Sequence, residues 1–326
     1  MINPSLSICI PTYNRFRDLN ETLFYVTKFS KHQNFVKEIF VLDNNENEKA
    51  KKIVNKYLKK YEKLKYMKNS YNIGGHENFK KCIETANSDF VWILTDDDIL
   101  FEYSLEKIFK NLQKDIDCLI VNWSLYDQNL NELVIENVIK SNKIFSDNKN
   151  FLLSEFDTKL TYVSSIIFKK NDFFLLVEDK LYDKYIPYGL TCLLTAYSIF
   201  LKENCKVVFE NIPIIKQRGY NDSFLSNSKN YYNVFSTGIN FFHKNFLELH
   251  YDKKSVNISK KKTFYFYIIK DLINKKILNE NFEFAFSSAY ENYKDIFTIK
   301  ILLLIIYIIP SISFSFFKKI NSIFKQ

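Results

Sequence analysis

The chain has 326 residues, of which 47% are hydrophobic, so it is long enough for one large or two smaller cores, and wholesale disorder is excluded. Its net charge of +9 favours anionic partners such as nucleotides or acidic lipid. Because the lysines are dispersed and no nucleic-acid-reading motif accompanies them, a nucleic-acid partner is not expected.

The cysteines lie far apart and show no spacing typical of metal ligands. They are Cys9, Cys82, Cys118, Cys192 and Cys205. An odd, dispersed set is typical of reduced thiols and predicts a cytoplasmic protein. The residues before the first apolar run are too few, and lack the basic segment, for a signal peptide. We therefore expect that the chain is not exported.

Short apolar runs alternate with helical patterns through the first hundred residues. Strands are expected at 6–10, 38–42, 64–67 and 90–94, and helices at 18–28, 49–61 and 77–86. Proline and polar residues after position 10 are expected to end the first strand. The alternation predicts an α/β fold with a doubly wound, mostly parallel sheet. Ligands bind such sheets at the carboxyl ends of the strands, where an acidic triplet follows the fourth strand.

The acidic triplet is Asp96, Asp97 and Asp98, directly after Thr95 and the apolar run from Phe90. Three adjacent carboxylates repel each other, and a divalent cation would remove that repulsion. Mg²⁺ is usually held by one or two carboxylates together with substrate phosphates, so the triplet predicts a Mn²⁺ or Mg²⁺ site. The alternative is that one aspartate only caps the next helix.

Four segments, in this order and spacing, resemble family 2 glycosyltransferases of the GT-A fold. They read SICIPTYN from Ser7, VLDNN from Val41, NIGG followed by HENF from Asn72, and TDDD from Thr95. The NIGG form is similar to abequosyltransferase-like members that build bacterial surface polysaccharides. The resemblance implies a metal-dependent, inverting transfer of a sugar from a nucleotide-activated donor to a glycan or lipid-linked acceptor.

The resemblance also implies roles for particular residues. Pro11, Thr12 and Asn14 would line the nucleotide pocket, Asp96 would contact the ribose or the metal, and Asp97 would be the main metal ligand with Asp98 beside it. Many relatives have a second aspartate at the position of Asn44, where the carboxylate accepts a hydrogen bond from uracil. Asn44 offers an acceptor and a donor, so the base stays open. A turn role for Asn44 is the alternative.

Three further residues near these strand ends have two interpretations each. Asp43 either contacts the nucleotide or is structural. Gly74 resembles part of a phosphate-cradling turn, although it also suits a positive φ before the next helix. His76, at the start of that helix, either lies near the diphosphate or is a solvated loop residue.

The second half of the chain lacks the acidic pair that the family usually supplies as general base. Tyr188-Gly189 stands at that place, and no carboxylate occurs between Asp183 and Glu203. Asp183, and next Asp179, are therefore the candidate bases, with a solvated surface position as the alternative. The missing pair also leaves open a non-catalytic nucleotide-binding or assembly protein on the same fold.

Further elements follow the acidic triplet. Strands are expected at 118–121, 162–168 and, as an edge strand, 205–209; residues 126–150 form a surface excursion or β-hairpin, and 190–201 a helix. Arg218 follows the last strand and either reaches the diphosphate, whose oxygens a guanidinium matches, or lies on the surface.

We divide the chain into a catalytic domain at 1–225, a helical region at 226–295 with helices at 234–249, 262–278 and 282–293, and a tail at 296–326. The uncharged stretch 301–317 has 17 residues and contains Pro310, whereas a spanning helix needs about 20. Flanking lysines predict an in-plane anchor at an anionic leaflet. The protein would then be peripheral at the inner face of the cytoplasmic membrane. A buried C-terminal helix is the alternative.

Overall fold

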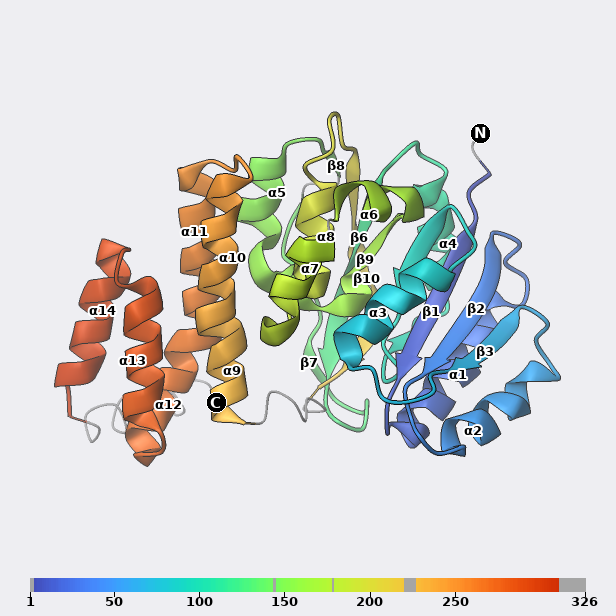
Figure 1. Ribbon diagram of the computed structural model, residues 1–326, viewed down its shortest axis with the longest axis horizontal. Coiled ribbons are helices and arrows are strands. Elements are labelled where there is room, and N and C mark those ends of the chain that lie inside the picture. Colours follow the sequence, from blue (N-terminus) through green and yellow to red (C-terminus); the bar gives the residue numbers. More distant parts are fainter. Residues whose placement is uncertain (1–2, 143–144, 178, 220–226, 311–326) are drawn as a thin grey trace. The chain divides into compact units, whose positions relative to one another are not determined.

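The computed structural model describes residues 3–142, 145–177, 179–219 and 227–310 (Figure 1). It divides into two compact units. An α/β unit comprises residues 1–149, 159–186 and 191–221, and a helical unit comprises 150–158, 187–190 and 222–326. The chain passes between the units for the last time at 221/222.

The α/β unit is built on a single mixed sheet. Its described strands are β1 (Leu6–Thr12), β2 (Val36–Asp43), β3 (Leu64–Lys68), β4 (Phe90–Ile93), β5 (Ile99–Leu100), β6 (Cys118–Tyr126), β7 (Leu133–Ile135), β8 (Phe145–Ser146), β9 (Ile166–Lys169) and β10 (Val207–Arg218). The order is β3-β2-β1-β4-β9-β6-β10-β5, with β7 on β6 and β8 on β10. Strands β1 to β4 pair in parallel, as do β6 and β10, whereas β9 runs antiparallel between β4 and β6.

Helices connect the strands, and those expected at 18–28, 49–61, 77–86 and 190–201 are all present. They are α1 (Phe16–Ser30), α2 (Lys49–Leu58), α3 (Gly75–Thr85), α4 (Ser104–Leu112), α6 (Lys170–Leu176), α7 (Asp179–Tyr185) and α8 (Thr191–Ile199). In α1 the spacing of Leu19, Leu23 and Val26 puts all three on the buried face. Every residue of β4 is buried, as expected for a strand covered on both faces. The α/β prediction with its parallel half is thus confirmed.

Three local predictions differ from the structure. β1 continues through Pro11 to Thr12, because Pro11 faces the same side as Cys9, where pairing with β4 has already ended. Residues 163–165 form a 3₁₀ turn rather than strand. The segment at 205–209 is not an edge strand, since β10 runs for 12 residues between β6 and the short β5 and β8. The β-hairpin expected after 126 is present as β6–β7.

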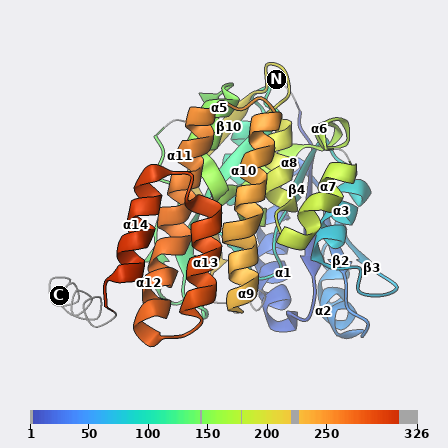
Figure 2. The same ribbon diagram turned by 60° about the vertical axis from the view of Figure 1, so that its left-hand side comes forward.

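The helical unit consists of rods that lie side by side in Figure 2. Its elements are α5 (Lys149–Phe156), α9 (Ser228–Tyr232), the π-helical η4 (Asn233–Gly238), α10 (Ile239–Glu248), α11 (Lys253–Thr263), the π-helical η5 (Phe264–Ile268), α12 (Ile269–Leu278), α13 (Phe282–Tyr293) and α14 (Phe297–Ile308). α9, η4 and α10 form one continuous rod, and α11, η5 and α12 form another. Aromatic side chains pack within this unit, with Phe235 stacked on Tyr267 at 4.0 Å between ring centroids.

The predicted tail begins with α14, which packs on α13. Among the helices that the structure describes, none is long and apolar enough to cross a membrane. The rest of the tail, 311–326, lies outside the described residues.

Candidate active site

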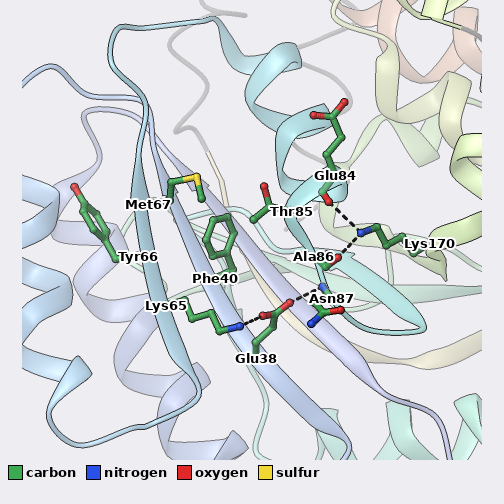
Figure 3. Close-up of a pocket in the computed structure, with 10 residues that line it drawn as sticks. All are labelled: Glu38, Phe40, Lys65, Tyr66, Met67, Glu84, Thr85, Ala86, Asn87 and Lys170. Carbon is green, nitrogen blue, oxygen red and sulfur yellow. Dashed lines mark hydrogen bonds and ion pairs between the residues drawn. The ribbon is translucent and has the colours of Figure 1, made fainter.

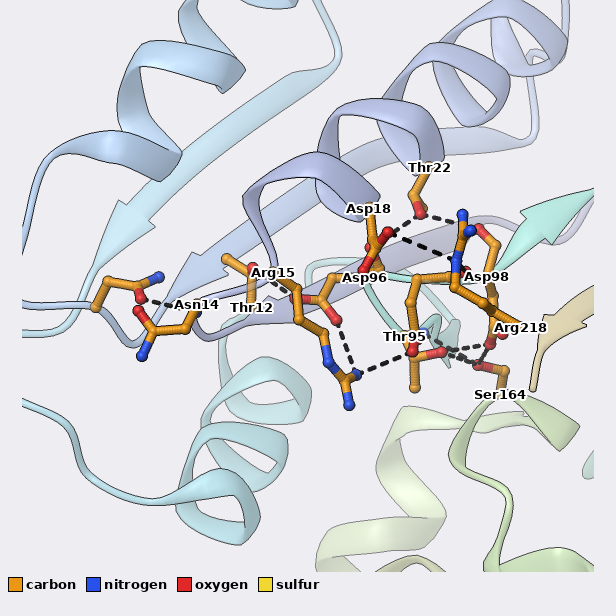
Figure 4. A network of polar contacts seen from close by, with 12 residues as sticks. Thr12, Asn14, Arg15, Asp18, Thr22, Thr95, Asp96, Asp98, Ser164 and Arg218 are labelled. Atoms are coloured by element: carbon orange, nitrogen blue, oxygen red, sulfur yellow. Dashed lines mark hydrogen bonds and ion pairs between the residues drawn. The ribbon is translucent and has the colours of Figure 1, made fainter. Parts of the chain in front are cut away.

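The carboxyl ends of the central parallel strands bring three loops together. Thr12 of β1 lies opposite Asp43 of β2, and Cys9 lies opposite Ile93 of β4. The loops after these strands therefore start at one edge of the sheet, where open α/β sheets bind their ligands (Figure 4). The Asp96–Asp98 triplet lies in the loop after β4.

Asp96 and Asp97 share one cation, the guanidinium of Arg15. Nη1 of Arg15 lies 3.3 Å from Oδ1 of Asp96 and 3.1 Å from Oδ2 of Asp97. The Thr12 hydroxyl donates to Oδ2 of Asp96 at 2.6 Å, so both oxygens of that carboxylate are oriented (Figure 4). Burial, reinforced by the charge of Asp97, raises the pKa of Asp96 to about 7, although Arg15 opposes the shift.

The Asp96–Asp97 pair offers carboxylate oxygens, which are suitable ligands for a divalent cation. No group of three or more His, Cys, Asp or Glu side chains forms a cation cage within the described ranges. Mg²⁺ does not need such a cage, because one or two carboxylates with substrate phosphates commonly suffice. Two carboxylates that already share a positive group fit that pattern, and we take Asp97 and Asp96 as the candidate ligands.

Asp98 faces hydroxyl groups. Its Oδ2 accepts from Tyr162 at 2.5 Å, from Ser164 at 2.7 Å and from the Thr95 hydroxyl. Burial, with a further contribution from Asp97, raises the pKa of Asp98 to about 7, while the three hydroxyls oppose the shift. These contacts join the end of β4 to the turn at 163–165 and favour a structural role. A role as metal ligand stays a prediction.

Asn44 uses its whole carboxamide within the protein. Its Oδ1 accepts from the Asn69 side chain and from the Ile73 backbone, both at 3.0 Å. Its Nδ2 donates to Oδ1 of Asn72 at 2.7 Å and to the Gly74 carbonyl at 3.3 Å. Two acceptor positions and two donors are the full capacity of the group. The geometry favours the turn role, and contact with a base stays a prediction.

Asp43 supports the loop after β1 through Asn45. Its Oδ1 accepts from the Asn45 backbone at 2.8 Å and side chain at 2.5 Å, and its Oδ2 accepts from Tyr66 at 2.7 Å. Asn45 in turn accepts the backbone N–H of Asn14 at 2.8 Å. Asn14 has a φ of 59°, a conformation that asparagine tolerates better than most residues. These contacts favour the structural role of Asp43, behind a loop that presents Asn14 to solvent, and contact of Asp43 with the nucleotide stays a prediction.

Gly74 and Pro11 both shape the edge through their backbones. Gly74 has a φ of 88° and directly precedes α3, which explains a glycine at this position. Its N–H donates to Asn72 and its carbonyl accepts from Asn44. Pro11 is half-buried and lies opposite Leu42 of β2. Contact of Gly74 or Pro11 with the nucleotide stays a prediction.

Arg218 is buried, and its guanidinium contacts other groups of the protein. Its Nη2 lies 2.7 Å from the Glu21 carboxylate, and its Nη1 donates to the Gln128 carbonyl at 2.8 Å. Its Nε lies 3.6 Å from Asp18 and 3.4 Å from the carbonyl of Asp97. The expected alternative of a surface position is wrong, since the side chain is 3% exposed. The guanidinium joins the end of β10 to α1, and its contact with a diphosphate stays a prediction.

The candidate bases lie on α7. Asp183 is exposed there, while its neighbour Tyr182 is buried and donates to the His76 carbonyl at 2.9 Å. Asp179 begins the same helix, and its side chain lies outside what the structure describes. No described contact joins Asp183 to the acidic triplet, so both bases stay predictions.

His76 makes a side-chain contact that a solvated loop residue would lack. It lies in the first turn of α3, is half-buried, and has its Nδ1 2.7 Å from Oγ1 of Thr191 at the start of α8. Burial lowers its pKa, which favours the neutral imidazole. The sequence predicts that His76 lies near the diphosphate or in solvent, and neither alternative includes Thr191 as its partner.

The sequence does not identify Arg15, Tyr162 and Ser164 as contacts of the acidic triplet. Arg15 directly follows the PTYN segment, and its position beside a predicted pocket was the available clue. Tyr162 and Ser164 contact Asp98 from 64 and 66 residues away. Contacts over such separations leave no local periodicity, so folding alone identifies them.

A hollow of about 550 Å³ lies elsewhere on the sheet (Figure 3). It is lined by residues near the amino ends of β2 and β3 and the end of α3, including Glu38, Lys65 and Asn87. Three of its charged side chains have partners, since Lys65 pairs with Glu38 at 2.6 Å and Lys170 binds the carbonyls of Glu84 and Ala86. The predicted nucleotide site lies instead at the carboxyl ends of the parallel strands.

Comparisons with known proteins agree with this architecture. Abequosyltransferase RfbV of Salmonella typhimurium is 27% identical over 279 residues, 82% of this chain and 80% of that protein. The GalNAc(5)-diNAcBac-PP-undecaprenol beta-1,3-glucosyltransferase of Campylobacter jejuni is 26% identical, with 71% of each chain covered. Both relatives are named as transferases, so the alternative of a non-catalytic protein finds no support in them.

The fold is shared with S. aureus TarS. The structure of TarS 1–349 in complex with UDP-GlcNAc has a TM-score of 0.57 and 15% identity, with 89% of both chains covered. This chain spans 45% of the longer TarS chain. Residues 7–172, half of the sequence, match the family model of glycosyl transferase family 2. The chain therefore belongs to glycosyl transferase family 2, and it is a glycosyltransferase.

Proposed function

We propose that this glycosyltransferase moves a sugar from a nucleotide-activated donor to a glycan or lipid-linked acceptor, with inversion and with a divalent metal ion. The observation that carries the proposal is the Asp96–Asp97 pair on Arg15 at the carboxyl end of β4. The name of the Campylobacter relative describes a lipid-linked glycan as its substrate, and TarS binds UDP-GlcNAc. These relatives support a role in bacterial surface polysaccharide or lipooligosaccharide synthesis.

The transfer reaction requires positive charge near the departing nucleoside diphosphate, because negative charge develops there as the bond to the sugar breaks. A bound Mn²⁺ or Mg²⁺ would supply that charge. Asp97, with Asp96 fixed by the Thr12 hydroxyl, would hold the ion at the strand end. Arg15 would keep the acidic pair together before the donor binds, and its guanidinium matches phosphate oxygens afterwards.

The second element of the proposal is a position at the inner face of the cytoplasmic membrane. α14 buries Ile299, Leu303 and Ile306 within the helical unit, yet its other residues, apart from Thr298 and Lys300, are also apolar. Phe297 and Ile308 are 73% and 75% exposed. An apolar outer face with an exposed Lys300 suits a helix lying in the headgroup region. The described cysteines are all free and buried, in keeping with a reducing compartment.

The decisive experiment compares wild type with D97N in nucleotide-sugar binding and turnover. UDP-, CDP- and GDP-linked hexoses are titrated with and without Mn²⁺, and release of nucleoside diphosphate is followed. We expect Mn²⁺-dependent binding and release in wild type, and a loss of at least about 100-fold in release for D97N. D115N is the matched control, since Asp115 is a 61% exposed surface aspartate. Normal metal-dependent binding and release by D97N would refute the metal site.

A further inference from the structure

The start of α8 lacks the carboxylate that an inverting transferase needs as a base. α8 begins at Thr191, and the segment between Asp183 and Glu203 has neither Asp nor Glu. Instead, the Thr191 hydroxyl lies 2.7 Å from Nδ1 of His76, across 115 residues of sequence. Thr191 is 1% exposed, so this hydroxyl is not a flexible surface group. The helix start that follows Tyr188-Gly189, the place of the missing acidic pair, is therefore joined to an imidazole.

His76 is held from two helices. Its ring contacts Thr191 of α8, and its carbonyl accepts the hydroxyl of Tyr182 from α7 at 2.9 Å. Tyr182 is buried, and the Lys80 ammonium lies 5.6 Å from the centre of its ring. The imidazole ring and the backbone carbonyl of His76 are thus both held in place. A group that transfers a proton needs such fixed positioning.

The loop that precedes α3 connects the start of that helix to the candidate donor site. His76 follows Gly74 by two residues, and the Gly74 carbonyl accepts from Asn44. The backbone N–H of Asn44 donates to the Thr12 carbonyl at 2.9 Å, and the Thr12 hydroxyl donates to Asp96. The first turn of α3, which carries His76, therefore lies along the same carboxyl edge of the sheet as the acidic pair.

We propose that His76 is the general base of the transfer, with Thr191 as the residue that positions it. This inference rests on the proposed function. When Nδ1–H donates to Thr191, Nε2 keeps its lone pair and accepts the proton of the acceptor hydroxyl. The acceptor oxygen then bonds to the anomeric carbon. The bond from that carbon to the β-phosphate oxygen breaks, and the nucleoside diphosphate leaves with the electron pair.

The surroundings favour a neutral imidazole that is ready to accept a proton. Titratable groups next to His76 or to its partners are Glu77 and Lys80 of α3, Tyr182 and Asp183 of α7, and Cys192 of α8, and Glu77, Cys82 and Cys192 act on Tyr182. Burial raises the pKa of Cys192 to about 12 and that of Tyr182 further, so both stay uncharged. Burial lowers the pKa of His76, and the amino end of α3 also disfavours a cation there.

The test compares H76N, T191V and the control H32N in the full-length protein. Asparagine keeps a polar atom near the Nδ1 position but offers no base, and His32 is exposed in the turn after α1. The probes are whichever UDP-, CDP- or GDP-linked hexoses wild type hydrolyses or transfers to 4-nitrophenyl glycosides with Mn²⁺. We measure the affinity for the nucleotide, kcat, and the pH profile of kcat.

We expect H76N to lower kcat by about 100-fold or more at unchanged nucleotide affinity, and to abolish the fall of kcat on the acidic side. T191V should lower kcat by about tenfold, and H32N should match wild type. A kcat of H76N within about threefold of wild type with the same acidic limb would overturn the inference, as would a loss of nucleotide affinity in H76N. Wild type without any Mn²⁺-dependent binding or turnover would instead refute the proposed function itself, and the inference with it.

Discussion

Replacing Asn44 by aspartate separates a structural role from contact with the base. The substitution preserves the size of the side chain and its acceptor oxygen toward Asn69 and Ile73. It replaces the two donors with an oxygen that faces Oδ1 of Asn72 and the carbonyl of Gly74. Asn44 is 2% exposed, so the new carboxylate has little access to water.

The expected loss of stability follows from the loss of those two hydrogen bonds. A buried polar group left without its partner costs about 1–3 kcal/mol. Asn72 and Gly74 are themselves exposed, so water can replace part of what they lose. We therefore expect N44D to lower the free energy of unfolding by about 2 kcal/mol. For a unit of this size that corresponds to a fall in Tm of about 4–8 °C.

The assay is thermal unfolding of N44D, wild type and the control N47D at pH 7.5 and pH 5. Asn47 lies exposed in the same loop and uses its side chain only as an acceptor, toward the Lys49 backbone, so N47D should unfold like wild type. At pH 5 the gap between N44D and wild type should shrink, because the neighbouring acceptors raise the pKa of the new carboxyl and its protonated form can donate. An unchanged Tm with a tenfold loss of nucleotide affinity would refute this reasoning and assign Asn44 to the base.

Three further predictions concern Asp98, Arg218 and α14. Burial raises the pKa of Asp98 from 3.8 to about 7, so the folded protein holds a proton that the unfolded chain releases. Stability should fall as the pH rises from 5 to 7, and D98N should reduce this dependence in urea unfolding, with the remainder due to Asp96, whose pKa is raised likewise. D98N should also keep its Mn²⁺-dependent nucleotide affinity, whereas a loss would make Asp98 a metal ligand. R218M should lower the free energy of unfolding by about 2–4 kcal/mol, because Glu21 and two carbonyls lose a buried partner; a stable R218M that no longer binds nucleotide would contradict this. Replacing Ile301 and Ile305 of α14, both about half-exposed, by glutamate should reduce cosedimentation with anionic vesicles at unchanged Tm, and undiminished cosedimentation would argue against the anchor.

The sequence by itself determined the architecture of the first hundred residues. The apolar run from Phe90 to Leu94 is buried throughout, and the spacing in α1 selects its inner face. Burial of apolar residues is read from local periodicity, because the periods of helices and strands differ. The convergence of Thr12, Asp43 and the acidic triplet followed from strand order alone, because parallel strands share one carboxyl edge.

Only the tertiary structure decided what each polar side chain does at that edge. Asp96, Asp97 and Asp98 are neighbours in sequence, yet the first two face Arg15 while the third faces Tyr162 and Ser164. Arg218 suits phosphate by its chemistry, but folding places it against α1. His76 acquires a partner 115 residues away. A carboxylate or a guanidinium can serve several roles, and the choice depends on which distant groups the packed chain brings within hydrogen-bond distance.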